Sequence, residues 1–226
     1  MEYAKIISWT GYLRKGDKTK GMSKIVIGID QSYKRTGITV LKDKQIIRMR
    51  SVNYEGCENN TDKRNFLWSA LERYLKTIAN PEKYDVTVIT ERIRLRSENF
   101  ISEDYIKATG ALVGTIIDVC RLYGLPVYSV DTKSWKNNIV GSSKPLNNPY
   151  GIDPKKYRTI LYLRDKGLLK YIVEEYKGRG KKGVLNVKIE GQKVPCKIND
   201  DLADSYCIAM YGFLPKEKQK LKEEKF

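Results

Sequence analysis

Histidine is absent from this 226-residue chain, and cysteine is scarce. The absence of histidine excludes a histidine general base and a histidine metal ligand. The four cysteines are scattered without a Cys-x-x-Cys pair, which argues against a zinc site. Cys120 and Cys207 lie in apolar helical patterns, and we expect them to be small core residues of a protein in a reducing cytosol. A metal site here would therefore need oxygen ligands, which favour magnesium or manganese.

Long apolar runs are missing as well. No stretch could span a bilayer, and residues 1–5 do not resemble a cleaved signal peptide, so we expect a cytoplasmic protein without a membrane partner. The charge is one-sided, with 43 Lys and Arg against 27 Asp and Glu, a formal net charge of +16 spread along the chain. Nucleic acid is the simplest densely negative partner. An anionic membrane surface is a weaker alternative, because we find no amphipathic basic helix with a Trp- and Leu-rich face.

The length suffices for one sizeable core. We interpret residues 1–23, which are basic and contain three glycines, as an extension to the fold or an expression remnant. Residues 24–214 form the predicted domain, which includes an enlarged basic segment at 142–199. Residues 215–226 are expected to be a charged, frayed tail.

Alternating strand and helix patterns follow from Lys24 onward. Two short turns, the second at Asp43-Lys44, join the first three strands into an antiparallel meander, and later strands alternate with helices, which predicts parallel pairing in a three-layer α/β arrangement. The predicted strands cover 25–30, 36–41, 45–52, 85–91 and 126–130, and the predicted helices 61–79, 102–123 and 154 onward.

Two helices carry specific expectations. Thr61 is the predicted N-cap of the first helix, whose buried stripe should comprise Phe66, Leu67, Ala70, Leu71, Tyr74, Leu75 and Ile78. In the second, Gly110 and Gly114 should permit the close approach of a neighbouring element.

Carboxylates stand at the boundaries of three apolar elements. Asp30 and Glu91 each end a predicted strand, and Asp201 and Asp204 lie at i and i+3 of a predicted helix. Neighbouring parallel strands would deliver Asp30 and Glu91 to one sheet edge, where a helix bearing two more acids completes an all-oxygen site for two divalent cations.

Each acid also has a simpler interpretation. Asp200 and Asp201 suit the positive end of a helix dipole, although this explains Asp204 poorly. Asp30 could begin a turn through its side chain, and Glu91 could be an exposed strand end.

Together these segments resemble the four acidic motifs of RuvC-type Holliday junction resolvases, members of the ribonuclease H-like superfamily. The motifs are Gly28-Ile29-Asp30-Gln31-Ser32 with Thr36-Gly37, then Ile89-Thr90-Glu91, and finally Asp201-Leu202-Ala203-Asp204-Ser205. The stretch from Trp135 to Gly141 is similar to the Val-Lys-x-x-Val-Val-Gly segment of that family. The resemblance covers roughly residues 24–212 and implies a mixed five-stranded sheet flanked by helices.

The resemblance implies a catalytic set of Asp30, Glu91, Asp201, Asp204 and Lys136, with the lysine near the scissile phosphate. The four acids would hold two Mg²⁺ or Mn²⁺ ions. Asp200 leaves the third ligand ambiguous by one position, and the Asp-x-x-Asp spacing favours Asp201. The family's second lysine has no clear counterpart, Lys144 being a loose candidate. The implied assembly is a homodimer acting on four-way junctions and forks in DNA recombination and repair.

Basic residues replace an aromatic that bacterial members place soon after the glutamate. Arg92, Arg94 and Arg96 would share one side of a continuing strand and meet successive phosphates. Lys133 and Lys144 are further candidates for contacting nucleic acid. The replacement suits the phage-encoded branch of the family, found in bacterial or phage-infected cells, whose members tolerate many branched DNAs.

The sequence therefore predicts a metal-dependent, structure-selective endonuclease for branched DNA. Two alternatives stay open: a superfamily nuclease acting on RNA or RNA–DNA hybrid, and a non-catalytic branched-DNA-binding protein on the same fold. A chelator-sensitive cleavage assay on junction, hybrid and duplex substrates distinguishes the three.

Overall fold

A computed structural model describes residues 22–80, 83–93, 103–147, 153–168, 172–175, 184–187, 196–197 and 200–224. The predicted extension at 1–23 thus lies outside the described residues except for its last two. Within the described part, no helix combines the length and the apolar character needed to cross a membrane.

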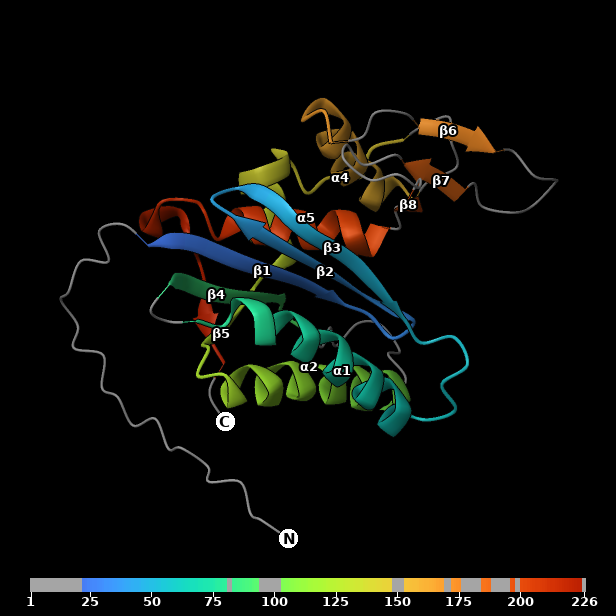
Figure 1. The fold of residues 1–226 in the computed structure, drawn as a ribbon. Coiled ribbons are helices and arrows are strands. Elements are labelled where there is room, and N and C mark those ends of the chain that lie inside the picture. The colour runs from blue at the N-terminus through green and yellow to red at the C-terminus, as the bar shows by residue number, and fades with distance from the viewer. Residues whose placement is uncertain are drawn as a thin grey trace, which may run out of the picture.

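A six-stranded mixed sheet forms the centre of the molecule, in the order β3-β2-β1-β4-β5-β9 (Figure 1). β1 pairs antiparallel with β2, and β2 with β3, while β1, β4 and β5 run parallel. The strands span β1 Ser23–Gln31, β2 Arg35–Lys42, β3 Gln45–Asn53, β4 Tyr84–Glu91, β5 Val127–Val130 and β9 Lys222–Glu223. Asp43 and Lys44 both have positive φ, at 49° and 70°, as the predicted tight turn between β2 and β3 requires.

Helices cover both faces of this sheet and complete three layers. α1 (Asn60–Ile78) and α2 (Glu103–Leu122) lie on one face, and α5 (Asp200–Tyr211) crosses the other, with α4 (Pro154–Asp165) beyond it (Figure 1). After β5 come a short helix α3 (Thr132–Trp135) and a π-helical turn η1 (Lys136–Val140). A separate antiparallel sheet has the order β6 (Ile172–Glu175), β7 (Val184–Val187) and β8 (Cys196–Lys197). The predicted three-layer fold with a mixed sheet is confirmed, with one strand more than expected.

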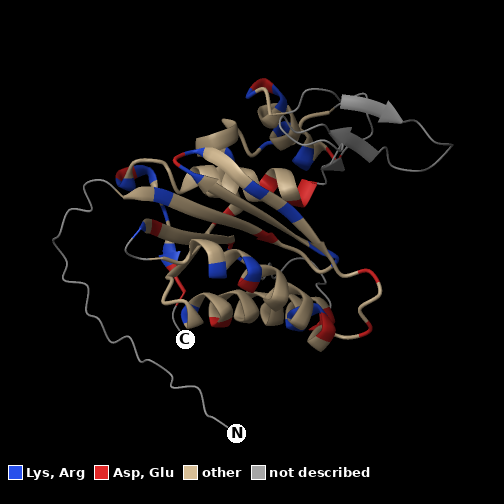
Figure 2. Ribbon diagram, viewed as in Figure 1, with Lys and Arg blue, Asp and Glu red and all other residues tan. Residues whose placement is uncertain are grey.

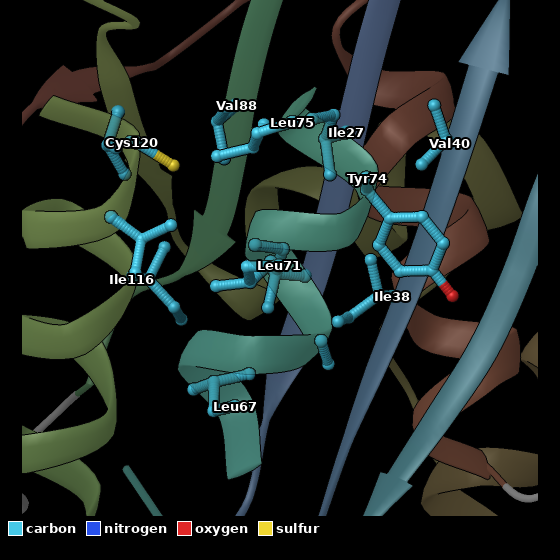
Figure 3. Packing of buried hydrophobic residues seen from close by; sticks show 14 of the residues in the cluster. Ile27, Ile38, Val40, Leu67, Leu71, Tyr74, Leu75, Val88, Ile116 and Cys120 are labelled. Carbon is cyan, nitrogen blue, oxygen red and sulfur yellow. The ribbon is translucent and has the colours of Figure 1, made fainter. Parts of the chain in front are cut away.

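The core has two halves because strand side chains alternate between the faces of the sheet. Odd-numbered positions of β1, such as Ile25 and Ile27, pack with Leu71 of α1 and Ile116 of α2, and Figure 3 shows this cluster. Even-numbered Val26 packs instead with residues of α5, including Ile208. This alternation decides which strand residues face α5, and therefore which ones can join its carboxylates.

Two expectations about α1 are wrong. Its N-cap is Asn59, whose side chain accepts a hydrogen bond from the Asp62 amide at 3.0 Å, and Thr61 already lies inside the helix. Phe66 is 59% exposed and does not belong to the buried stripe, although the other six predicted residues do. A stripe read from helical spacing extends about 100° around the helix, and Phe66 lies just beyond the part that the sheet covers.

The charged tail is ordered where the structure describes it, which corrects the expectation of fraying. Residues 216–218 form a 3₁₀ turn (η2), and β9 pairs antiparallel with β5. Tyr211 anchors the segment, because its hydroxyl accepts a hydrogen bond from the Lys220 amide at 2.7 Å. Pairing with β9 covers the outer edge of β5, whose backbone groups would otherwise remain unpaired.

Candidate active site

The ends of β1 and β4 place Asp30 and Glu91 side by side. In their parallel pairing Ile29 lies opposite Thr90, so the next residue of each strand is its carboxylate. Asp30 and Val26 are both even-numbered positions of β1, and Glu91 and Ile89 are both odd-numbered positions of β4. Val26 and Ile89 pack on the α5 side of the sheet. Alternation thus directs both acids toward α5 at the carboxyl edge of the sheet.

Two glycines let α5 approach this edge closely. A Cβ atom on Gly28 would lie 2.1 Å from the backbone oxygen of Ser205, and one on Gly37 would lie 2.1 Å from that of Asp201. No side chain fits at such distances, so only glycine allows the helix backbone to rest on β1 and β2. This seating brings the predicted i, i+3 pair Asp201 and Asp204 to Asp30.

Asp30 interacts electrostatically with the other three predicted acids. Burial raises its pKa well above the usual value, and the charges of Glu91, Asp204 and Asp201 raise it further. Its side chain is only 8% exposed, so little water is present to screen the repulsion between these carboxylates. Four acids from three elements therefore converge, as the sequence predicted.

Asp204 is the second buried acid. Burial raises its pKa to about 7, although the nearby Lys136 ammonium opposes the shift. Its Oδ1 atom is buried without a hydrogen-bond partner, one of three such side-chain atoms within the described ranges. The Thr159 hydroxyl also favours the charged form of Asp204, yet neither atom completes a hydrogen bond. An orphaned buried carboxylate oxygen is costly unless a ligand satisfies it.

Asp200 and Asp201 differ in where they point. Asp201 is 4% exposed and acts on the pKa of Asp30, and burial raises its own pKa against the opposing Arg35 guanidinium. Arg35 Nε donates to Asp201 Oδ2 at 3.0 Å. Asp200 instead pairs with Lys156 of α4 and, at 3.5 Å, with Arg35. This geometry favours Asp201 as the inner acid, and in Figure 2 acidic and basic segments lie side by side where α5 begins beneath α4.

Lys136 reaches the cluster from the π-helical turn after β5. Its ammonium lies 3.9 Å from Asp204 Oδ2 and donates to the backbone oxygen of Lys155 at 3.1 Å. The residue is buried, which is rare for lysine unless its charge is paired. The family-like segment thus delivers its lysine to the acids. Gly141, with φ of 86°, ends the turn in the left-handed conformation.

Hydrogen bonds fix the ends of β1 and β4. The Gln31 side-chain amide donates to the Glu91 backbone oxygen at 2.6 Å, and the Thr90 hydroxyl donates to Gln31. The Glu91 carboxylate itself accepts a hydrogen bond from the Thr132 hydroxyl of α3. Glu91 is intermediate in exposure, so it remains accessible from the edge.

The acids suit a divalent cation in chemistry but not in their present arrangement. Clustered carboxylates with raised pKa values and an orphaned Asp204 oxygen are typical of a site that needs positive charge. Among the described residues, however, no group of three or more acidic or cysteine side chains is arranged to hold a metal ion. The carboxylates turn instead to Arg35, Lys136, Lys156 and Thr132.

The structure describes only some of the residues that the sequence predicts to contact nucleic acid. β4 ends at Glu91, so Arg92 does not continue the strand as expected, and its guanidinium binds Asp131 at 3.4 Å and Ser129 at 3.3 Å. Arg94 and Arg96 lie outside the described residues. Lys133 and Lys144 are exposed on the segment after β5.

Sequence reasoning missed the importance of two cations. Neither Arg35 nor Lys156 is among the residues that the sequence predicts for the site, yet both pair with acids of α5. The available signals were the place of Arg35 beside Thr36-Gly37 of the first motif and that of Lys156 in the first turn of a capped helix. Neither signal reveals a partner about 45 or 165 residues further along the chain.

Comparisons place this arrangement among known structures. No protein-family model and no curated protein sequence matches the chain. Among solved structures, Thermus thermophilus RuvC in complex with a Holliday junction substrate is similar, with a TM-score of 0.52 and 14% identity, covering 84% of this chain and 93% of that one. A second Thermus thermophilus RuvC structure gives 0.52 and 16%, covering 82% and 91%. The chain therefore has the fold of RuvC, as the motif resemblance predicted.

Proposed function

We propose that this chain with the RuvC fold is a metal-dependent endonuclease that cleaves phosphodiesters of Holliday junctions and other branched DNA. The observation that carries the proposal is the convergence of Asp30, Glu91, Asp201 and Asp204 at one sheet edge. Without histidine, acid–base work by imidazole is not available, and carboxylate-held cations are the alternative route to phosphodiester cleavage. The net charge of +16 suits a polyanionic substrate.

These four acids, with Asp200 at their margin, would hold two Mg²⁺ or Mn²⁺ ions. When bound, such ions supply charge neutralisation and an activated water at neutral pH. The protein's own contribution is to fix the acids on rigid elements and to exclude solvent. Lys136, held between Asp204 and the Lys155 backbone, is positioned to interact with a phosphate at this edge.

Arg35 and Lys156 have a role in this proposal before and during DNA binding. Arg35 pairs with Asp201, and Lys156 pairs with Asp200. Both side chains are about two-fifths exposed, so they can turn toward phosphates and free the carboxylates. We further propose that the protein works as a homodimer, which would present two such sites to opposed strands of a junction, and that it belongs to the phage-encoded branch.

Cleavage of a labelled four-way junction tests the proposal. The wild-type protein should nick the junction with Mg²⁺ or Mn²⁺ and not with a chelator, and should act more slowly on duplex DNA and on RNA–DNA hybrid. Asp30→Asn should keep junction binding and lower the cleavage rate by at least about 100-fold, because an essential carboxylate is lost.

Asp85→Asn is the matched control, since Asp85 is an exposed acid at the opposite end of β4 and should leave the rate unchanged. Nicking that survives Asp30→Asn in a clean preparation contradicts the proposal. Junction binding without turnover in any metal favours a non-catalytic binding protein, and preference for the hybrid favours an RNA-directed nuclease.

A further inference from the structure

Two exposed tyrosines lie at the same end of the sheet as the acids. Tyr33 belongs to the turn between β1 and β2, three residues after Asp30, and Tyr105 lies in the first turn of α2. Their ring centroids are 6.5 Å apart, with planes tilted by 39°. Tyr33 is 39% exposed and Tyr105 is 42% exposed. The two rings, which come from distant segments of the chain, therefore form one apolar surface in contact with water. Paired exposed aromatics of this kind are typical of a binding surface.

A buried lysine packs against one member of this pair, Tyr33. The Lys63 ammonium lies 3.4 Å from the centroid of the Tyr33 ring, although Lys63 itself is only 7% exposed. A cation over a ring face is attracted by the ring's quadrupole, and the attraction strengthens away from water. The Tyr33 ring is therefore fixed before any ligand arrives, which lowers the entropy lost on binding.

We propose that Tyr33 and Tyr105 form a stacking surface for an unpaired or partly unstacked base of branched DNA. The inference rests on the proposed function for its ligand class. A base at a branch point lacks a stacking neighbour on one side, and an aromatic ring replaces that neighbour whatever the base is. The turn that carries Tyr33 follows Asp30 directly, so a base stacked there belongs to nucleotides close to the cleaved phosphate.

The net charge favours nucleic acid over a second copy of the chain as the occupant, although the exposed acids Glu103 and Asp104 also lie beside Tyr105 in the first turn of α2. Lys63 lies against Tyr33, and the next residue in the turn, Lys34, is exposed. A second copy would bring the same cations to the same place, in a protein that already carries +16. A DNA strand brings phosphates on both sides of every base, which these lysines attract.

Photo-crosslinking tests the surface directly. A four-way junction carries 5-iodouracil at its branch-point positions, and a duplex carries it in the same sequence; both are irradiated with the full chain in chelator, so that no cleavage occurs. Cross-links to Tyr33 or Tyr105, mapped by mass spectrometry, should form with the junction and be at least about 10-fold weaker with the duplex. Tyr33→Ala with Tyr105→Ala should raise the Kd for the junction about 10-fold and that for the duplex less than 2-fold.

Conservative and remote variants keep the outcome interpretable. Tyr33→Phe with Tyr105→Phe keeps the rings and should retain junction affinity, which separates stacking from loss of folding. Leu122→Ala removes another exposed apolar side chain, at the opposite end of α2, about 26 Å from Tyr105 along the helix, and should change neither Kd.

Two results overturn the inference: cross-links that map only elsewhere, and an unchanged junction Kd in the double alanine variant. An alanine variant that loses dimerisation, while its junction Kd per dimer is unchanged, also overturns it by showing a contact between copies. Because these measurements need no metal, a protein that cross-links through Tyr33 but cleaves nothing would refute the nuclease proposal alone.

Discussion

At the scale of single residues, protonation links the acid cluster to stability. Burial and mutual repulsion raise the pKa values of Asp30 and Asp204, so the folded protein retains protons that an unfolded chain releases. The stability that protonated Asp204 contributes is complete below its ordinary pKa near 4 and is lost as pH rises through about 7. The metal-free protein is therefore expected to lose stability across this range.

Asp204→Asn removes this pH dependence at one position. In chelator, the variant should gain about 1–3 kcal/mol more free energy of unfolding over wild type at pH 8 than at pH 5, because asparagine carries no charge to bury. Urea unfolding at the two pH values measures the difference. Asp85→Asn, at an exposed carboxylate, should show no such pH-dependent gain. A gain equal at both pH values would point to packing rather than charge.

Lys156 should compete with a metal ion for Asp200. Lys156→Met removes the ammonium and keeps the apolar stem, so Mn²⁺ should bind about 3–10-fold more tightly without DNA, as expected for one lost charge near the protein surface. Calorimetric titration of Mn²⁺ measures this. The neighbouring Lys155→Met is the control, because Lys155 is exposed and contributes its backbone oxygen, and its effect should stay below 2-fold. Equal affinities in all three proteins would refute the competition.

At the scale of elements, the approach of α5 to the sheet decides whether a site exists. Alternation along β1 and β4 could be read from sequence, and it correctly predicts Asp30 and Glu91 on one edge. The close seating of α5 on Gly28 and Gly37 could not be read, because glycine in a strand has several possible reasons. For Gly110 and Gly114, where close approach was expected, nothing lies within 4 Å of an added Cβ, so that prediction is wrong.

Gly28→Ala should therefore destabilise the protein by about 1–3 kcal/mol or more, because its Cβ would displace the α5 backbone. The acids of α5 would move with the helix, so cleavage should fall as well. Gly110→Ala is the matched control and should instead stabilise α2 by about 0.5–1 kcal/mol, since open space surrounds it in a helix interior. Thermal unfolding of both variants measures these changes in stability. A Gly28→Ala variant as stable as wild type would contradict the close contact between the α5 backbone and β1.

At the scale of the whole molecule, positive charge surrounds a negative centre. The chain carries +16, and Figure 2 shows basic segments on every layer, while buried carboxylates gather at one sheet edge. A polyanion is attracted to the protein as a whole, yet the cluster repels its phosphates unless cations intervene. Binding and chemistry are thus expected to respond differently to salt and to divalent metals.

Junction affinity should fall steeply with monovalent salt. If 6–10 phosphates are contacted, the affinity should drop about 10³–10⁵-fold between 50 and 200 mM salt. Fluorescence anisotropy in chelator measures the slope, and Asp30→Asn should keep it, because a carboxylate neutralises no phosphate. A nearly flat dependence would show that the basic surface is solvated rather than used for binding.

The sequence by itself determined most of the elements of the central fold, their order and the acidic motifs, because strand alternation and helix spacing are local properties. It could not decide that Phe66 is exposed, that residues 222–223 add a sixth strand, or that Arg35 and Lys156 turn to the acids of α5. Those features depend on contacts between residues far apart in the chain, which only the packed tertiary structure creates. The contact between Tyr33 and Tyr105 also joins residues far apart in the chain, so it too depends on the tertiary structure.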